Sequence, residues 1–189
     1  MTTSTQPKAE KSHGIDTTAH EAFLAFAEEN PEAVQFVLSA VGTDEGRVLH
    51  TCSQTQSYTL GGQEFDRVAR GYTHHFGGHK EVEAAVGFVD PTDREEAIEV
   101  ALAALTGCIH GSVSLSGGPA GLDIRQIETA VTVEFDPFVF LGLEATRDDD
   151  GTPTNMFGDI RVDVRVSGED LDDDILDQVR GWASRSPTY

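Results

Sequence analysis

Two cysteines and a run of histidines are the residues in this chain whose types suggest chemistry. Cys108 lies near the end of an apolar run, 97–109, that only Glu99 and Thr106 interrupt. A thiol reacts as its thiolate, which a neighbouring cation favours. The candidate cations are Arg47, His75, His79 and His110. Small buried cysteines are also common as inert packing, so a reactive and a structural role both stay open for Cys108.

Glu99 precedes Cys108 by nine residues. At about 100° per residue, nine residues place two side chains on opposite sides of a straight helix. Glu99 is therefore expected either at an exposed edge of the helix or in contact with a partner across a dimer.

The histidine run reads HHFGGH, with His74, His75 and His79 around a pair of glycines. Imidazoles serve as metal ligands and as general acids or bases. The spacing matches no zinc pattern, and no cysteine pair accompanies it. The alternative interpretation is a solvated loop.

Cys52 and His50 occupy alternate positions of one predicted strand, so they share a face. Cys52 is a candidate second thiol if its strand passes Cys108. Two cysteines are too few for a disulfide scaffold.

The predicted elements that position these residues begin with the helix that carries Cys108, which we expect Thr92 or Asp93 to cap. A helix that is apolar on every side must be buried on every side, so we expect the rest of the chain to wrap around it. An earlier helix is predicted over about 17–29, capped near Asp16 and ended by Asn30-Pro31.

Strands are predicted on both sides of the central helix. A hairpin joins Val34–Val41 to Arg47–Ser53 through a turn at 42–46. The other predicted segments are strands at Ser57–Leu60, Glu64–Arg70, Val82–Val89, Asp123–Phe135 and Gly158–Ser167, a loop at Arg70–Lys80, a bend at Asp136–Leu143 and a final helix at Asp170–Ser184. This order indicates an α+β fold with mostly antiparallel sheet.

The length of 189 residues favours one domain, over 16–189, after a polar and disordered tail at 1–15. With 33 acidic against 13 basic residues, the net charge of −20 opposes binding to nucleic acid or to an anionic membrane. Such an acidic chain, with only three lysines, is typical of a salty cytoplasm, so we expect a halophilic source. The sequence has no apolar run of 18 residues and no signal-peptide core, which predicts a cytoplasmic protein without a membrane span.

Three segments of the sequence resemble the OsmC-like family, which is related to the organic hydroperoxide resistance proteins. They are the helix AIEVALAALTGC, the late pair GLDIRQIETAVTVEFD and MFGDIRVDVRVSGEDLDDDILDQV, and the ending ASRSPTY. The resemblance implies two sheets around central helices, formed as an intertwined homodimer with sites at the subunit interface.

The resemblance also implies site residues. Cys108 matches the family's peroxide-attacking cysteine, and Ser186 stands where the peroxidases have their resolving cysteine. Glu99 is one place from the family's glutamate position, which Ile98 occupies, and Arg47 follows the arginine position by three residues. The expected catalytic residues are thus Cys108, Glu99 and Arg47, and the expected substrate-binding residues are His75, His79 and Ser186.

These residues predict reduction of organic hydroperoxides, or of other small electrophiles, through one cysteine and an external thiol. No cofactor or metal is implied. Two alternatives stay open. One is a non-catalytic dimeric protein that binds a small molecule, and the other is an enzyme that uses His75 or His79 as its base while Cys108 only packs.

Overall fold

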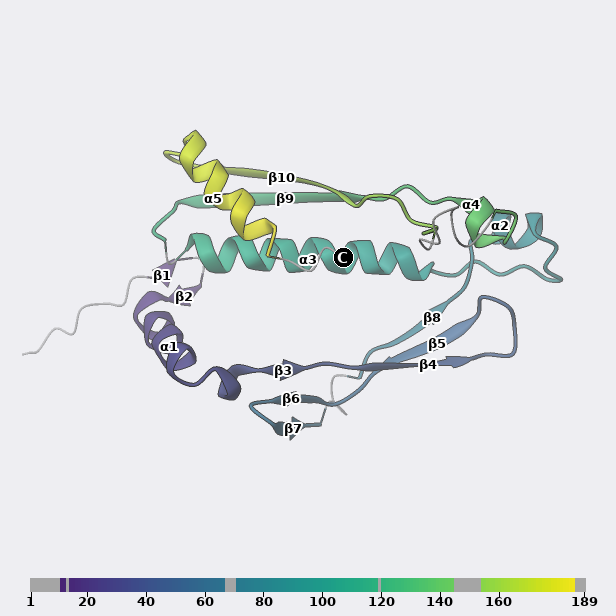
Figure 1. Cartoon of the computed structure of the whole chain (residues 1–189), viewed down its shortest axis with the longest axis horizontal. Coiled ribbons are helices and arrows are strands. Elements are labelled where there is room, and N and C mark those ends of the chain that lie inside the picture. Colours follow the sequence, from purple (N-terminus) through teal and green to yellow (C-terminus); the bar gives the residue numbers. More distant parts are fainter. Residues whose placement is uncertain (1–10, 13, 67–70, 119, 145–153, 186–189) are drawn as a thin grey trace, which may run out of the picture. The chain divides into compact units, whose positions relative to one another are not determined.

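The computed structural model describes residues 11, 12, 14–66, 71–118, 120–144 and 154–185. The protein is a mixed α+β structure of helices and small antiparallel sheets, as expected for the fold class (Figure 1). By its internal contacts the chain divides into two units, Met1–Ala101 and Leu102–Tyr189.

The first unit begins with the short strands β1 (Lys11–Ser12) and β2 (Ile15–Asp16) and the helix α1 (Thr17–Glu29). The predicted helix is confirmed, and so are its cap at Asp16 and its end at Asn30. Asp16 Oδ1 accepts a hydrogen bond from Ala19 N at 3.0 Å, and the N–H of Asn30 donates to Phe26 O at 2.9 Å. A short 3₁₀ helix, η1 (Pro31–Val34), follows.

Two antiparallel sheets of three strands each complete the first unit. One has the order β3 (Phe36–Val37), β6 (Tyr58–Leu60), β7 (Gln63–Phe65), and the other β4 (Ala40–Asp44), β5 (Thr51–Thr55), β8 (Thr73–Phe76). The predicted hairpin is present as β4 and β5. Its turn is at 45–50 and not at 42–46, because Gly42 pairs with Ser53 inside the ladder.

Two predicted elements of this unit are wrong. The loop expected at Arg70–Lys80 contains β8, which pairs with β5, so the glycines only flank a strand. The strand expected at Val82–Val89 is instead the helix α2 (Lys80–Ala85), whose KEVEAA sequence contains good helix formers. The predicted strand at Glu64–Arg70 is present only as the end of β7, and its last four residues lie outside the described ones.

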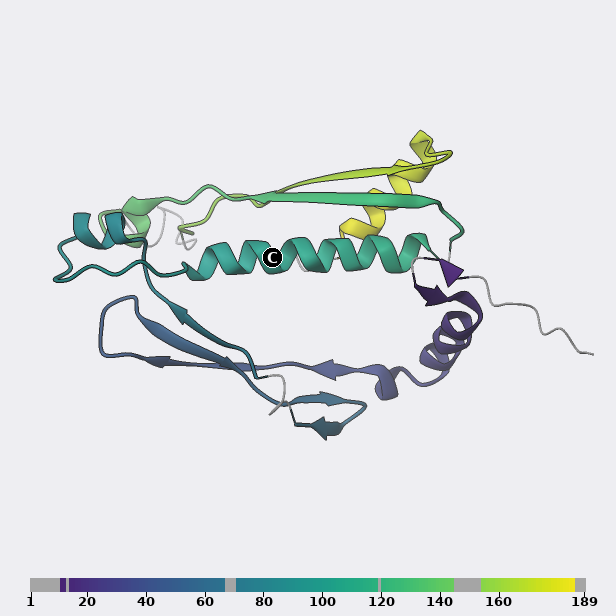
Figure 2. The same ribbon diagram turned by 180° about the vertical axis from the view of Figure 1, so that it is seen from behind.

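In the second unit, β9 (Ile124–Thr132) and β10 (Arg161–Gly168) form a long antiparallel pair, seen side by side in Figures 1 and 2. In β10 half-buried and exposed residues alternate strictly, as the predicted strand requires. The helix α5 (Asp173–Ala183) follows it. The bend expected at Asp136–Leu143 contains the one-turn helix α4 (Pro137–Phe140). Val113, Ile124 and Val179 form the buried core of this unit.

The long helix α3 (Ala97–Gly117) starts later than predicted. Residues 94 and 95 are extended because they pair beside the end of β8: Gly77 N donates to Glu95 O at 3.1 Å and Arg94 N to Gly78 O at 3.2 Å. Thr92 and Asp93 therefore do not cap the helix.

The expectation that α3 is buried on every side is also wrong for the single chain. Within the described residues of α3, only Ile109, Val113 and Gly117 are buried, while Cys108 and Leu115 are exposed. In the second unit a two-stranded sheet and one helix cover only one side of it. With 21 residues and a mean hydropathy of 1.5, α3 is long and apolar enough to cross a membrane, but core helices of soluble proteins have the same properties.

Candidate functional site

Among the described residues of the first unit, five imidazole–carboxylate pairs occur between the sheet β4–β5–β8, the helix α2 and residues 91–99. They join His50 to Glu83, His74 to Glu95, His75 to Glu45, and His79 to both Glu99 and Glu96. Three of these histidines come from the HHFGGH run, and each has a different carboxylate partner. The run is therefore not one shared cluster.

The pair of His50 and Glu83 is buried. Glu83 is fully inaccessible, and its Oε1 accepts a hydrogen bond from His50 Nε2 at 2.7 Å. Its Oε2 accepts from Thr92 N at 2.7 Å, and Gly78 N donates to Oε1 at 3.4 Å. Burial alone would raise the pKa of Glu83, but the N–H of Thr92, the His50 ring and the N–H of Gly78 together lower the pKa to about 2. Glu83 is thus a buried carboxylate held in its charged form.

Arg47 is fixed beside this carboxylate. Its Nη2 donates to Val89 O at 2.7 Å and to Asp90 O at 2.9 Å, and the same nitrogen lies 3.6 Å from Glu83 Oε2. The guanidinium also stacks 5.2 Å from the centre of the Phe88 ring. Arg47 lies in the turn between β4 and β5 and binds the segment after α2 at Val89 and Asp90. Its role in this structure is therefore structural.

Glu99 meets His79. Its Oε2 accepts from His79 Nε2 at 3.1 Å and from the backbone N of Glu96 at 3.2 Å. The Glu96 N–H and then the His79 ring lower the pKa of Glu99, and the hydrogen bond to Glu99 raises the pKa of His79. The carboxylate of Glu96 lies further from the ring, at 3.8 Å from Nδ1. The structure thus brings together one expected catalytic and one expected substrate-binding residue.

His75 is hydrogen-bonded to Glu45, a residue that the sequence did not identify as a candidate. His75 Nδ1 lies 2.9 Å from Glu45 Oε1, and Arg94 Nη1 donates to the other oxygen of the same carboxylate. Arg94 also donates to Phe76 O at 3.4 Å. The hydrogen bonds from Arg94 and then from His75 lower the pKa of Glu45. This pair is accessible, since 57% of the His75 side chain is exposed.

Cys108 is exposed on α3 in the second unit, whereas Glu99, Arg47, His75 and His79 belong to the first. Ser186 lies outside the described residues. Arg47 and Glu99, the expected catalytic partners of the thiol, each have their own partners in the first unit.

The residues that sequence reasoning missed are Glu45, Glu83 and Arg94. In a chain with 33 acidic residues, no local pattern distinguishes the two glutamates from solvated ones. Arg94 precedes an apolar helix and reads as an ordinary flanking charge. In the part of the chain that the structure describes, no group of three or more His, Cys, Asp or Glu side chains is arranged to hold a metal ion.

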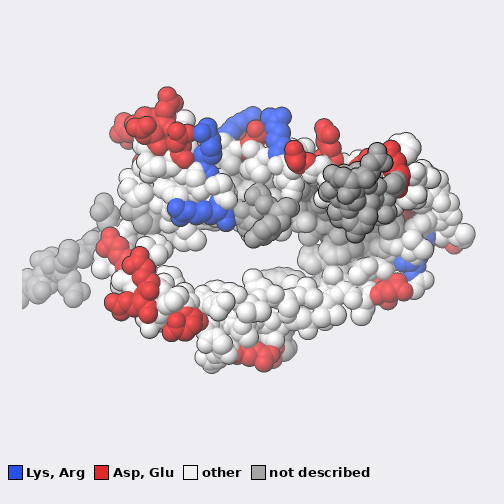
Figure 3. Space-filling view, viewed as in Figure 1, with Lys and Arg blue, Asp and Glu red and all other residues white. Residues whose placement is uncertain are grey.

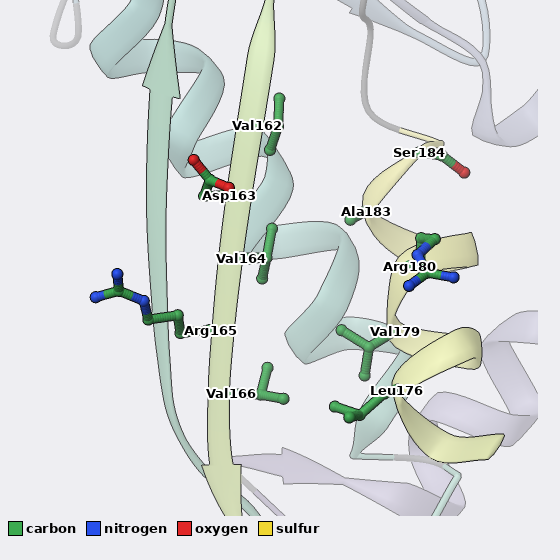
Figure 4. A pocket seen from close by; sticks show the side chains of 10 residues that line it. All are labelled: Val162, Asp163, Val164, Arg165, Val166, Leu176, Val179, Arg180, Ala183 and Ser184. Atoms are coloured by element: carbon green, nitrogen blue, oxygen red, sulfur yellow. The ribbon is translucent and has the colours of Figure 1, made fainter. Parts of the chain in front are cut away.

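A groove of about 820 Å³ lies in the second unit between β10 and α5 (Figure 4). The valines of one β10 face line it on one side and the apolar face of α5 on the other, with the side chain of Arg180 nearby. The lining includes Val162, Val164, Val166, Leu176, Val179 and Ala183. Its volume lies within the range of small-molecule sites.

No known family model matches this sequence. Comparison with curated protein sequences likewise finds no similar protein.

Proposed function

We propose that this protein is an OsmC-like, thiol-dependent protein that reduces organic hydroperoxides or consumes another small electrophile through Cys108. The observation that carries the proposal is the exposed thiol of Cys108 on a 21-residue apolar helix. The long pair β9–β10 followed by α5 agrees with the late strands and final helix of the resemblance.

In the proposed reaction, the Cys108 thiolate attacks the terminal oxygen of a hydroperoxide. The O–O bond breaks, the sulfur becomes a sulfenic acid, and the leaving alkoxide takes a proton to become an alcohol. Serine at 186 cannot form a disulfide, so an external thiol condenses with the sulfenic acid and releases water. A second molecule of that thiol then restores Cys108 by thiol–disulfide exchange.

In this proposal Glu99 and Arg47 are not catalytic partners of Cys108 within one chain, as the sequence led us to expect. Arg47 stabilises the first unit through Glu83, and Glu99 orients His79. In a homodimer, the proposed assembly, the Glu99–His79 pair of one copy is the candidate source of a proton and a cation for a thiol of either copy.

The experiment that tests the proposal measures hydroperoxide consumption with dithiothreitol as the external thiol. Wild type should consume cumene hydroperoxide, and Cys108→Ser should lose at least about 90% of the rate, since the thiolate is the nucleophile. Cys52→Ser is the matched control, because it removes the only other cysteine. Equal rates in wild type and Cys108→Ser contradict the proposal.

A second candidate function is favoured by the groove between β10 and α5, which is large enough for a small organic molecule. In this alternative the protein is a non-catalytic homodimer that binds an apolar ligand. Wild type would then bind a fluorescent apolar probe with a 1:1 stoichiometry per chain. Val164→Asp would abolish this binding, and neither protein would consume hydroperoxide.

The proposed location is the cytoplasm, because free thiols persist there. The proposed source is halophilic, on the strength of the net charge of −20.

A further inference from the structure

Cys52 and His75 are direct neighbours across two strands. In the sheet β4–β5–β8, Cys52 pairs with His75 on one side and with Thr43 on the other. Side chains of directly paired residues project from the same face, with their Cβ atoms about 4.5–5.5 Å apart. A thiol and an imidazole therefore stand side by side on this sheet.

The carboxylate of Glu45 orients the imidazole. His75 Nδ1 donates its hydrogen to Glu45 Oε1 at 2.9 Å, which leaves Nε2 of the neutral ring as the proton acceptor. A carboxylate in this position also stabilises the imidazolium that forms when the ring takes a proton.

Glu45 is itself held in place. Arg94 binds its second oxygen and also donates to Phe76 O, the backbone carbonyl next to His75 on β8. Glu45 is the first residue after β4, and through Arg94 its carboxylate is linked to β8, the strand that carries the base.

The three groups are also accessible to a reactant. Cys52 is half-buried and His75 is exposed, whereas His50 and Glu83 are sealed from solvent. Of these two imidazole–carboxylate pairs, the accessible one stands beside a thiol, and it can therefore act on a molecule from solution.

We propose that Cys52 is a second nucleophile, with His75 as its general base and Glu45 as the positioning residue, and that it takes small α,β-unsaturated carbonyl compounds. His75 Nε2 removes the Sγ proton, and the sulfur electron pair forms a bond to the β-carbon. The carbon–carbon π pair moves onto the carbonyl as an enolate, and the imidazolium returns the proton to the α-carbon. This addition needs no oxidant, no leaving group and only one base, which matches what the site contains.

The test uses N-ethylmaleimide, an unsaturated carbonyl probe, with Cys108→Ser protein, in which Cys52 is the only thiol. Thioether formation is followed by intact mass at pH 7. His75→Asn in this background should slow the addition by roughly 10- to 100-fold, as expected for loss of general base catalysis. His74→Asn is the matched control, because His74 is the neighbouring imidazole of the same run but pairs with Ser53 and projects from the other face of the sheet. It should change the rate less than twofold.

The positioning role of Glu45 has a separate measurement. Glu45→Gln should move the midpoint of the pH–rate profile toward that of the His75→Asn protein while the circular dichroism spectrum stays unchanged. A rate that is the same with and without His75 overturns the proposal, and so does a Cys52 rate no faster than that of the urea-unfolded protein. Because the background lacks Cys108, this outcome is independent of hydroperoxide consumption by Cys108.

Discussion

Glu83 is the residue whose surroundings are most unusual, since a charged carboxylate is completely buried among donors. Its partners are two backbone N–H groups, the Thr92 hydroxyl, His50 and, at 3.6 Å, Arg47. A buried charge is tolerated only when such donors replace water. We therefore expect the first unit to depend on Glu83 for stability.

Glu83→Gln tests this dependence. The amide keeps the size but leaves His50 and the backbone donors without their anion, so the thermal midpoint should fall by roughly 5–10 °C. Glu81→Gln, an exposed change on the same helix, should have little effect.

The pKa of Glu83 is lowered from 4.5 to about 2, so its stabilisation is complete above pH 4.5 and is lost as the pH falls toward 2. The difference between wild type and variant should close over that range, and a constant difference would contradict this assignment.

His79 offers the opposite sign of pH dependence. Its pKa is raised above 6.5 by the hydrogen bond to Glu99. The stabilisation from this pair is complete below pH 6.5 and is lost as the pH rises through the higher folded value. An NMR titration of the His79 ring should give a pKa above 6.5 in wild type and a lower one in Glu99→Gln. Glu96→Gln, which removes the carboxylate at 3.8 Å, should shift it less.

At the level of elements, the sequence predicted what local signals determine. The cap at Asp16 and the stop at Asn30 define α1, and the alternation of valines defines β10. The strand β8 was missed because its pairing with β5, distant in the chain, determines it, while the flanking glycines indicate a loop. For the same reason the sequence identified His75 as a candidate but not its pairing with Glu45, 30 residues away in the chain. The pairing of Glu45 with Arg94, 49 residues away, was missed as well.

The register shift at the end of β10 is a further feature at the scale of elements. Between Ser167 and Gly168 the pairing with β9 slips, and a Cβ at Gly168 would collide with the carbonyl oxygen of Asp123. Because glycine has no side chain, the end of β10 can approach the backbone of Asp123 next to β9.

Gly168→Ala should lower the free energy of unfolding by about 1–3 kcal/mol, because backbone atoms of Asp123 must move. Gly181→Ala is the matched control. Its Cβ would meet nothing within 4 Å inside α5, so the free energy of unfolding should rise by about 0.5–1 kcal/mol. Urea unfolding measures both. Equal effects of the two substitutions would show that the close approach at Gly168 does not affect the free energy of unfolding.

For the whole molecule, charge is the dominant property. Acidic side chains gather over α1 and at the start of α5 on the face drawn in Figure 3. With a net charge of −20, self-repulsion opposes the folded state at low salt. Salt at 1 M reduces the Debye length to about 3 Å and screens this repulsion.

We therefore expect the thermal midpoint to rise by at least about 5 °C between 0.1 M and 2 M KCl, measured by scanning calorimetry. Glu28→Gln with Glu29→Gln removes two negative charges from the carboxyl end of α1, where they are unfavourable, and should reduce the salt effect. Equal midpoints at both salt concentrations would contradict the halophilic interpretation.

Exposed apolar surface is the second whole-molecule property. Leu115 on α3 is 52% exposed, and Cys108 on the same helix is exposed as well. An apolar helix with an uncovered side favours association, and a second copy of the chain is the partner that the proposed homodimer supplies. Light scattering should then give about twice the chain mass of 20.3 kDa.

Leu115→Lys should convert this dimer to a monomer, because a lysine at an apolar contact loses its hydration when the interface closes. Gln126→Lys adds the same charge at an exposed position of β9 and should leave the mass unchanged. If the dimer covers Cys108, alkylation of that thiol should be several-fold faster in the Leu115→Lys monomer than in wild type. A wild-type mass of one chain at micromolar concentration would contradict the dimer, and an alkylation rate that is the same in both forms would place Cys108 outside the interface.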